Sequence, residues 1–265
     1  MSNHSKRLTF AILNLVGYVG VLIVNYLAVS LPLNGKDTGA LSDQYPNLFV
    51  PAGLTFSIWG IIFILLGIFV VYSLVYTLQN RNLTTSTFLD KIGYWFLISC
   101  IANMSWLFAW HYEILPLSLL IMLLILGSLI AIYQRQRIGN SNVSNTEKYL
   151  THLPFSIYLG WISVATIANV TALLVNAGVG GLGLGEPLWA VAVILVAITL
   201  AMVMIFNRND IFYALVVAWA LLGIYLKRSA ALDVVQVITI TAIIGMSLIL
   251  LTSLVQIFRR RVYRN

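Results

Sequence analysis

Charged residues are scarce in this sequence, and their scarcity excludes a water-soluble protein. Only 9% of the 265 residues are charged, whereas 60% are hydrophobic. A chain of this composition has too little polar surface to cover a soluble globule. We therefore expect lipid to be its solvent.

Cysteine and histidine are also nearly absent. The single cysteine, Cys100, excludes an internal disulfide and lies in an apolar stretch, where we expect it to fill space. The three histidines, His4, His111 and His152, are far apart in the chain and show no helical pairing. HExxH motifs and multi-histidine oxidase sites thus have no ligands here. We expect neither a metal site nor a metalloenzyme.

Acidic residues are absent from the interiors of the long apolar stretches. All 8 of them fall at the ends of these stretches or between them. Transporters that couple to protons or ions usually keep a charged group inside the membrane, so the sequence argues against that class. It also offers no nucleophile, metal set or buried acid–base pair. We therefore expect a protein without enzymatic activity and with no required cofactor.

Long apolar stretches are what the sequence has in abundance. They are continuous rather than alternating, which favours membrane-spanning helices over a β-barrel. The sequence therefore predicts an all-α integral membrane protein, a bundle of about eight transmembrane helices. The seventh, at 16 residues, is just shorter than the roughly 17 needed to cross. The predicted spans are residues 8–29, 54–78, 92–111, 115–134, 153–176, 187–206, 211–226 and 234–258.

The distribution of basic residues predicts the orientation. With the N-terminus inside, Lys36, Lys227 and Arg228 lie outside, and the other basic residues lie in inner segments. Lys and Arg are retained on the cytoplasmic side, so we predict a multi-pass protein of the cell membrane with both termini cytoplasmic. The basic cluster in residues 259–264 is typical of contact with anionic headgroups. We expect membrane lipid, and no nucleic acid, as a partner.

Aromatic and amide side chains share helical faces in the first five spans. At about 100° per residue, Phe56, Trp59 and Phe63 lie on one face of the second span. An asparagine in hydrocarbon needs a hydrogen-bond partner, so such faces should turn toward one another or toward a bound molecule. The other faces carry Asn14, Tyr18 and Asn25 on the first span, Phe96, Ser99, Asn103, Trp106 and Trp110 on the third, and Tyr158, Trp161, Ala165, Asn169, Ala172 and Asn176 on the fifth.

Two interpretations of these faces stay open. In the first, the asparagines bond across helices and the tryptophans fill the core or lie at the membrane interface. In the second, the faces line a pocket, with Trp161 as a deeper structural residue. A rise of about 1.5 Å per residue places four of the side chains in one layer, roughly 8 to 12 Å below the outer ends of their spans: Trp59, Asn103, Trp106 and Asn169.

Three short motifs follow one another on successive spans. The first motif is Pro46, Pro51, Trp59, Phe63 and Gly67, in which the last three are spaced by four residues. The third span carries Asn103-Met-Ser-Trp106, and the fifth carries Pro154-Phe155 and then Trp161-Ile-Ser163-Val-Ala165-Thr-Ile-Ala-Asn169. Together the motifs resemble those of the tryptophan-rich sensory protein family (TspO/MBR), which includes the mitochondrial translocator protein. The resemblance covers residues 8–176.

The resemblance implies a five-helix bundle that binds planar apolar molecules such as porphyrins, haem or sterols. It implies a receptor, sensor or carrier whose partner is a hydrophobic small molecule, with porphyrin or haem as a ligand rather than a cofactor. Family members are often dimeric, which implies a homodimer. The loop after the first helix would cap the site, with residues 46–51 as its lid. The ligand-binding residues carried over from the motifs are Trp59, Phe63, Asn103, Trp106, Asn169, Pro46 and Pro51.

The sequence also departs from the family pattern. Ala52 follows Pro51 where the family has a second proline, and Phe63 replaces a tyrosine. Residues 187–265 have no counterpart in the five-helix family. We therefore divide the chain into a TspO/MBR-like five-helix domain, residues 1–185, and an additional three-helix membrane segment with a basic cytoplasmic tail, residues 186–265. These added helices leave an alternative function, a permease or transporter subunit for a small hydrophobic solute.

Overall fold

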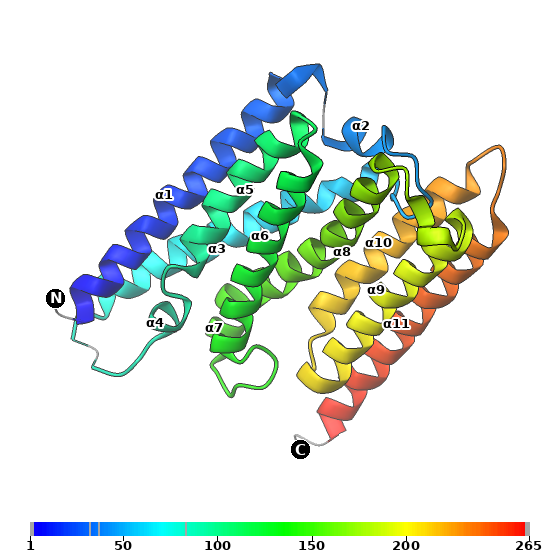
Figure 1. Cartoon of the computed structure of the whole chain (residues 1–265). Helices are drawn as coiled ribbons and strands as arrows, with labels where there is room; N and C mark the ends of the chain where they lie inside the picture. The colour runs from blue at the N-terminus through cyan, green and yellow to red at the C-terminus, as the bar shows by residue number, and fades with distance from the viewer. Residues whose placement is uncertain (1–2, 32, 37, 83, 263–265) are drawn as a thin grey trace. The chain divides into compact units, whose positions relative to one another are not determined.

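Helices are the only regular secondary structure in the part of the chain that the structure describes. A computed structural model describes residues 3–31, 33–36, 38–82 and 84–262, and none of these residues forms a strand. The chain forms two compact units (Figure 1). Unit 1 comprises Met1–Thr38 and Trp59–Leu159, and unit 2 comprises Gly39–Ile58 and Gly160–Asn265. The all-α prediction is confirmed, while the end of the predicted basic tail, residues 263–265, lies outside the described residues.

Seven helical stretches of the described chain are long and apolar enough to cross a membrane. The other predicted span, residues 92–111, is α5 (Trp95–His111), whose 17 residues are at the lower limit of about 17 for crossing. It begins late because Gly93, with φ of 54°, ends the short helix α4 (Phe88–Ile92) just before it. The seven stretches are Asn3–Ser30, Gly53–Gln79, Leu115–Gln136, Asn145–Asn176, Glu186–Arg208, Ile211–Ser229 and Gln236–Arg259.

Unit 1 is organised around α5. Helix α1 (Asn3–Ser30) packs along one side of α5 and α6 (Leu115–Gln136) along another (Figure 1). Two glycines let α1 approach closely, since a Cβ at Gly17 would lie 3.2 Å from Cys100 Cβ, and one at Gly20 would lie 3.0 Å from Met104 Sδ.

The remaining helices of unit 1 meet in an aromatic core. Phe69 of α3 (Ile58–Gln79), Phe96 of α5 and Phe155 of α8 (Leu153–Asn176) contact one another edge to face. Their ring centroids are 4.9 to 5.8 Å apart, and all three side chains are buried. Such edge-to-face pairs add to the stability that burial of the rings supplies. The short helix α7 (Asn145–Glu147) and a π turn (Lys148–His152) lead into α8.

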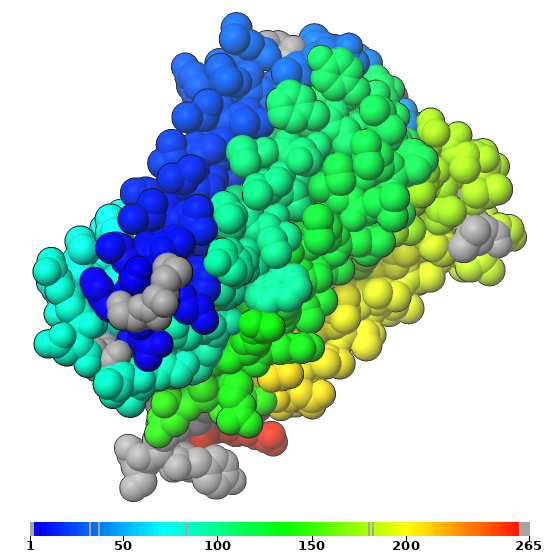
Figure 2. All heavy atoms as spheres, turned by 60° about the vertical axis from the view of Figure 1, so that its left-hand side comes forward, coloured from blue at the N-terminus to red at the C-terminus, as the bar shows by residue number. Residues whose placement is uncertain are grey.

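The surface of unit 1 is apolar along its helices. Figure 2 shows side chains of α1, α5 and α6 covering one continuous face. Large apolar side chains are exposed there, including Val16 and Ile23 on α1 and Leu120 and Leu124 on α6. A soluble protein rarely exposes such an area, whereas lipid tails solvate it. The multi-pass membrane assignment follows from this surface and from the seven apolar helices.

Unit 2 contains the last three helices, α9 (Glu186–Arg208), α10 (Ile211–Ser229) and α11 (Gln236–Val262). Each packs against the other two. Two further close approaches shape the unit: a Cβ at Gly160 of α8 would lie 3.1 Å from the Tyr213 carbonyl oxygen, and one at Gly245 would lie 2.8 Å from Ile198 Cγ1. The small residues thus set the helix spacing.

Helix α10 corresponds to the short seventh predicted span. Its 19 residues extend beyond the predicted 211–226, which makes it long enough to cross. The side chain of Asp210 accepts hydrogen bonds from the backbone N–H groups of Phe212 and Tyr213 and caps the first turn.

The two compact units do not follow the predicted boundary at residue 185. Unit 2 combines α9, α10 and α11 with residues from Gly160 of α8 onward and with residues 39–58. The latter segment contains most of α2 (Thr38–Asp43) and the 3-10 turn Gly53–Ser57. Independent ligand binding by residues 1–185 stays a prediction.

Candidate ligand-binding site

Three aromatic side chains from α3 and α8 form an aromatic cluster in unit 1. The rings of Trp59 and Phe63, one turn apart, stack with centroids 5.4 Å apart and an interplanar angle of 26°. Tyr158 meets Trp59 at 5.9 Å and 64°. Trp59 and Phe63 are half-buried, so part of this stack is available to another molecule. Stacked rings present a flat apolar area with little conformational entropy to lose.

Asn103 lies next to this cluster and joins three helices. Its Nδ2 donates to Tyr158 Oη at 3.4 Å, and its Oδ1 accepts from Asn25 Nδ2 at 3.1 Å. The residue is 2% exposed. Both ends of its amide are therefore bonded to protein groups, as the first interpretation of the asparagine faces expects. Tyr158 and Asn25 were placed on the polar faces by periodicity, but the sequence did not identify them as site residues.

Trp106 lies one turn beyond Asn103 on α5. It stacks on Trp110 with ring centroids 5.7 Å apart and an interplanar angle of 16°. Trp106 is 7% exposed, and its Nε1 has no hydrogen-bond partner within the described structure. A buried indole N–H without an acceptor is unfavourable, so an acceptor on a bound molecule would be stabilised here.

The end of α5 is joined to the segment after α1 through His111. Its Nδ1 contacts the Leu33 carbonyl oxygen at 3.0 Å and its Nε2 contacts Thr38 Oγ1 at 3.1 Å. The Nδ2 group of Asn34 donates to the His111 carbonyl oxygen at 3.0 Å, and Trp110 Nε1 donates to the Thr38 carbonyl oxygen at 3.4 Å. In the sequence, His111 was considered only as a metal ligand and rejected as one, so this role was not predicted.

A buried amide in α1 has no such partners. Asn14 is 1% exposed, and within the described residues neither its Oδ1 nor its Nδ2 has a hydrogen-bond partner. The two residues predicted to share its face are bonded: Tyr18 Oη donates to the Phe63 carbonyl oxygen and Asn25 donates to Asn103. Ordered water commonly satisfies a buried polar group of this kind.

Three of the predicted site residues belong to unit 2. Asn169 is buried in α8. Pro46 is exposed, whereas Pro51 is buried and lies against Gly223 of α10, where a Cβ would come within 3.0 Å of Pro51 Cβ. The other four, described above, belong to unit 1. Trp161, expected to be structural, is buried in unit 2 and meets the Phe56 ring edge to face at 5.8 Å.

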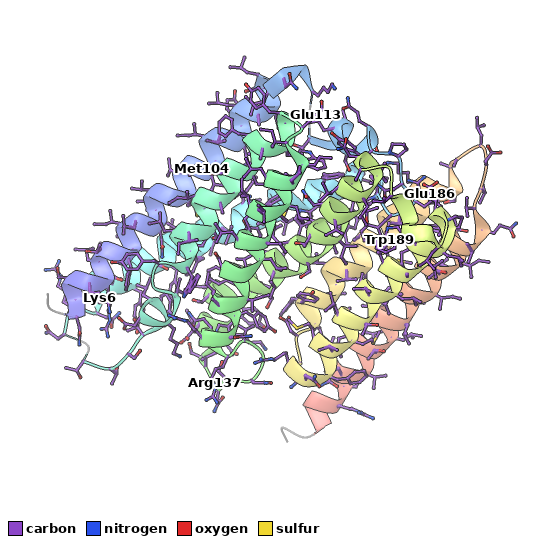
Figure 3. The ribbon with its side chains drawn as sticks, viewed as in Figure 1. Lys6, Met104, Glu113, Arg137, Glu186 and Trp189 are labelled. Carbon is purple, nitrogen blue, oxygen red and sulfur yellow. The ribbon has the colours of Figure 1, made fainter. Side chains whose placement is uncertain are left out.

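The opposite end of unit 1 carries an ion pair. Arg7 Nε lies 2.8 Å from Asp90 Oδ2, and Thr87 donates to the same oxygen from its backbone N–H and its hydroxyl. Burial raises the pKa of Asp90, but the bonds from Thr87 and the Arg7 charge outweigh it and hold the pKa below its usual value. Figure 3 shows Lys6 and Arg137 at this end and Glu113 at the other.

The described residues contain no group of three or more His, Cys, Asp or Glu side chains that could hold a metal ion. The aromatic cluster offers instead a binding surface for an apolar molecule. Asn103 adjoins the cluster through its hydrogen bond to Tyr158, and one turn further along α5 Trp106 carries an indole N–H without a partner in the described structure.

Comparison with known proteins identifies one family. The family model described as TSPO-like protein matches residues 11–255. The match confirms the resemblance based on the three motifs, and it also includes most of the last three helices, for which the five-helix family offered no counterpart. No curated protein and no solved structure matches the chain.

Proposed function

Because this chain belongs to the TSPO-like protein family, we propose that it is a non-enzymatic membrane receptor, sensor or carrier for a planar hydrophobic ligand. Porphyrin, haem or a sterol-like molecule fits this description, as a ligand and not as a required cofactor. The proposal starts from the finding that the chain is a multi-pass membrane protein of this family.

The observation that carries the proposal is the half-buried stack of Trp59 and Phe63 with Tyr158 at its edge. A planar ligand gains most from offset stacking on flat rings that are already held in place. The stack is held by α3 and α8, so little side-chain entropy would be lost when a ligand binds.

Polar contacts would orient the ligand on this surface. The unpartnered Trp106 Nε1 is a donor for a carboxylate or carbonyl group. Asn103 Oδ1 accepts one bond from Asn25, and a carbonyl oxygen has a second lone pair for a ligand donor. The family resemblance alone adds Asn169, Pro46 and Pro51 to the proposal, with the two prolines in the lid.

The proposal includes an orientation in the cell membrane. With both termini cytoplasmic, the His111 end of unit 1 would face outward and the Arg7–Asp90 end would face the cytoplasm, where the concentration of basic residues follows the positive-inside rule. Ligand would then reach the aromatic cluster from the outer leaflet. Contact with membrane lipid follows from the apolar surface, and a homodimer is proposed from the family resemblance.

A titration of the purified protein with protoporphyrin tests the function. We expect saturable quenching of tryptophan fluorescence and a change in the porphyrin absorption band. The test variant is Trp59→Leu, which removes part of the stack. The matched control is Trp95→Leu at the start of α5, where the indole contacts Arg135. Weaker binding in Trp59→Leu together with unchanged binding in Trp95→Leu supports the proposal. Absence of saturable binding to porphyrin, haem and sterol would overturn it.

A further inference from the structure

The connection between α1 and α3 is bonded to α10 inside unit 2. We call residues 43–55 the anchored segment. Figure 1 shows this stretch of chain, after α2, beside the end of α10. The Ala52 backbone N–H donates to the Gly223 carbonyl oxygen at 3.0 Å, and Trp219 Nε1 donates to the Thr55 carbonyl oxygen at 3.0 Å. Both bonds use backbone groups of the segment, so they fix the path of the chain.

The absence of a side chain at Gly223 allows the hydrogen bond from the Ala52 N–H group to form. A Cβ at this position would overlap Thr55 Oγ1, and it would lie 3.0 Å from both Thr55 Cβ and Pro51 Cβ. Only a residue without a side chain lets the anchored segment come this close to the helix. A carbonyl group within a helix already accepts one bond, and its second lone pair serves Ala52.

Arg228 holds the middle of the anchored segment. Its Nη2 donates to the Asn47 carbonyl oxygen at 3.1 Å and to the Val50 carbonyl oxygen at 3.3 Å. Asn47 Oδ1 accepts from the backbone N–H groups of Phe49 and Val50, and these local bonds stabilise the turn that Arg228 contacts. Hydrogen bonds from a charged donor are stronger than neutral ones.

The last contact is weaker. Lys227 pairs with Asp43 at the start of the anchored segment, but the Asp43 side chain is 59% exposed. An exposed ion pair contributes little to stability. The segment is thus held mainly by Arg228, Gly223 and Trp219, all on α10, whose bonds fall between Asn47 and Thr55. This stretch contains Pro51 and directly follows Pro46.

We propose that α10 is an anchor for the lid of the ligand site. Arg228, Gly223 and Trp219 are positioning residues that hold the anchored segment in place and so set the rates at which ligand binds and leaves. The inference rests on the proposed function, because it assigns Pro46 and Pro51 to the lid. The last three helices, predicted from the sequence as an additional membrane segment, thereby gain a role in regulating the site.

Thiol labelling tests the anchor without any ligand. In a Cys100→Ser background, Val50→Cys places a thiol where the native side chain is 3% exposed. Arg228→Ala should raise its rate of reaction with a maleimide by about tenfold or more, because loss of two charge-assisted bonds frees the turn. Arg228→Lys, which keeps a charged donor, should restore part of the protection. Arg259→Ala, an exposed arginine of α11, is the matched control and should change nothing.

Stopped-flow binding of protoporphyrin to the same Arg228 variants tests whether the anchor sets the rates of ligand binding and release. Arg228→Ala should raise both the association and dissociation rate constants, with a smaller change in Kd, and Arg228→Lys should return both toward wild type. A purely structural role predicts lower yield or lower affinity without this paired change. Unchanged Val50→Cys labelling in Arg228→Ala would overturn the anchor, and faster labelling with unchanged rate constants would overturn its control of binding. If the wild-type protein binds neither protoporphyrin, haem nor sterol, the proposed function is rejected, while the labelling result still decides the anchor.

Discussion

Asn25 on α1 donates a side-chain hydrogen bond to Asn103 on α5, with 3.1 Å between Nδ2 and Oδ1. Asn103 in turn donates to Tyr158, whose ring meets Trp59. The amide pair therefore positions the aromatic cluster through Tyr158, and it joins helices that are far apart in the sequence. A polar link of this kind supports the binding surface even where it does not itself contact a ligand.

Removing one partner of that pair should destabilise unit 1. Asn25→Ala leaves the buried Asn103 oxygen without this donor, which costs about 1 to 3 kcal/mol. Asn103→Ala should cost a similar amount, and the double variant less than the sum of the two. Thermal unfolding in detergent measures the three values. Strictly additive losses would mean that the bond contributes nothing to stability.

The aromatic cluster should account for much of the affinity. Trp59→Leu is expected to preserve membrane insertion and weaken protoporphyrin binding by about 1 to 3 kcal/mol, the scale of a lost buried aromatic contact. Trp106→Leu, which removes both ring area and an indole donor, should weaken binding by a similar amount. Equilibrium titration of each purified variant gives the values. Unchanged affinity in both would show that these rings only pack the helices.

Impermeant thiol reagents applied to intact cells check the predicted orientation. Ser42, the natural choice for a cysteine in the first outer loop, is 8% exposed, so the exposed Gln44 is a better position. In a Cys100→Ser background, cysteines at Gln44 and Ala177 should react, and one at Ser141 should react only after permeabilisation. Reaction at Ser141 in intact cells would invert the orientation.

Truncation after Gly185 separates binding from lid control. The shortened chain keeps the aromatic cluster and Asn103 but loses Trp219, Gly223 and Arg228. We expect it to insert and to bind protoporphyrin with faster dissociation than the full chain. Protease protection first shows whether the truncated chain is inserted. The dissociation rates of the two proteins then show whether the last three helices slow ligand release. Complete loss of binding would place α9, α10 or α11 in the site itself.

Acid should destabilise unit 1 through Asp90. Its pKa is lower in the folded protein than in the unfolded chain, so the ionised folded state is favoured. This contribution is fully present above the unfolded value of about 3.9 and disappears as pH falls through the lower folded pKa. Midpoints of thermal unfolding between about pH 3 and 7 should therefore fall on acidification more in the wild type than in Asp90→Asn. Parallel curves would contradict this role.

Sequence periodicity predicted the contacts that lie within one helix. Trp59 and Phe63 are four residues apart, a spacing that places them on one face of any helix, and they do stack. The contact of Trp59 with Tyr158 depends on how two helices cross, and periodicity does not determine that. The approximate positions of the spans were predicted because hydrophobic length sets them. Their ends differ from the prediction in places, as where Gly93 shortened α5 and where α10 extends to Ser229.

The anchor on α10 left no signal in the sequence. Arg228 and Asn47 are 181 positions apart, and the acceptors in the anchored segment are backbone carbonyls, which every residue carries. Asn47 and Gly223 looked like an ordinary loop residue and an ordinary helix glycine. Trp219 was not among the candidate site residues, and its bond to Thr55 likewise could not be predicted from the sequence.

The close approach at Gly223 has a consequence for natural variation. Substitution by alanine would push the anchored segment away from α10, so a relative with a larger residue at the equivalent position could not form the bond from residue 52 to the helix. Relatives with and without glycine there should therefore divide into chains whose lid is tethered and chains whose lid moves freely. One column of an alignment would then distinguish slow-exchanging from fast-exchanging members of the family.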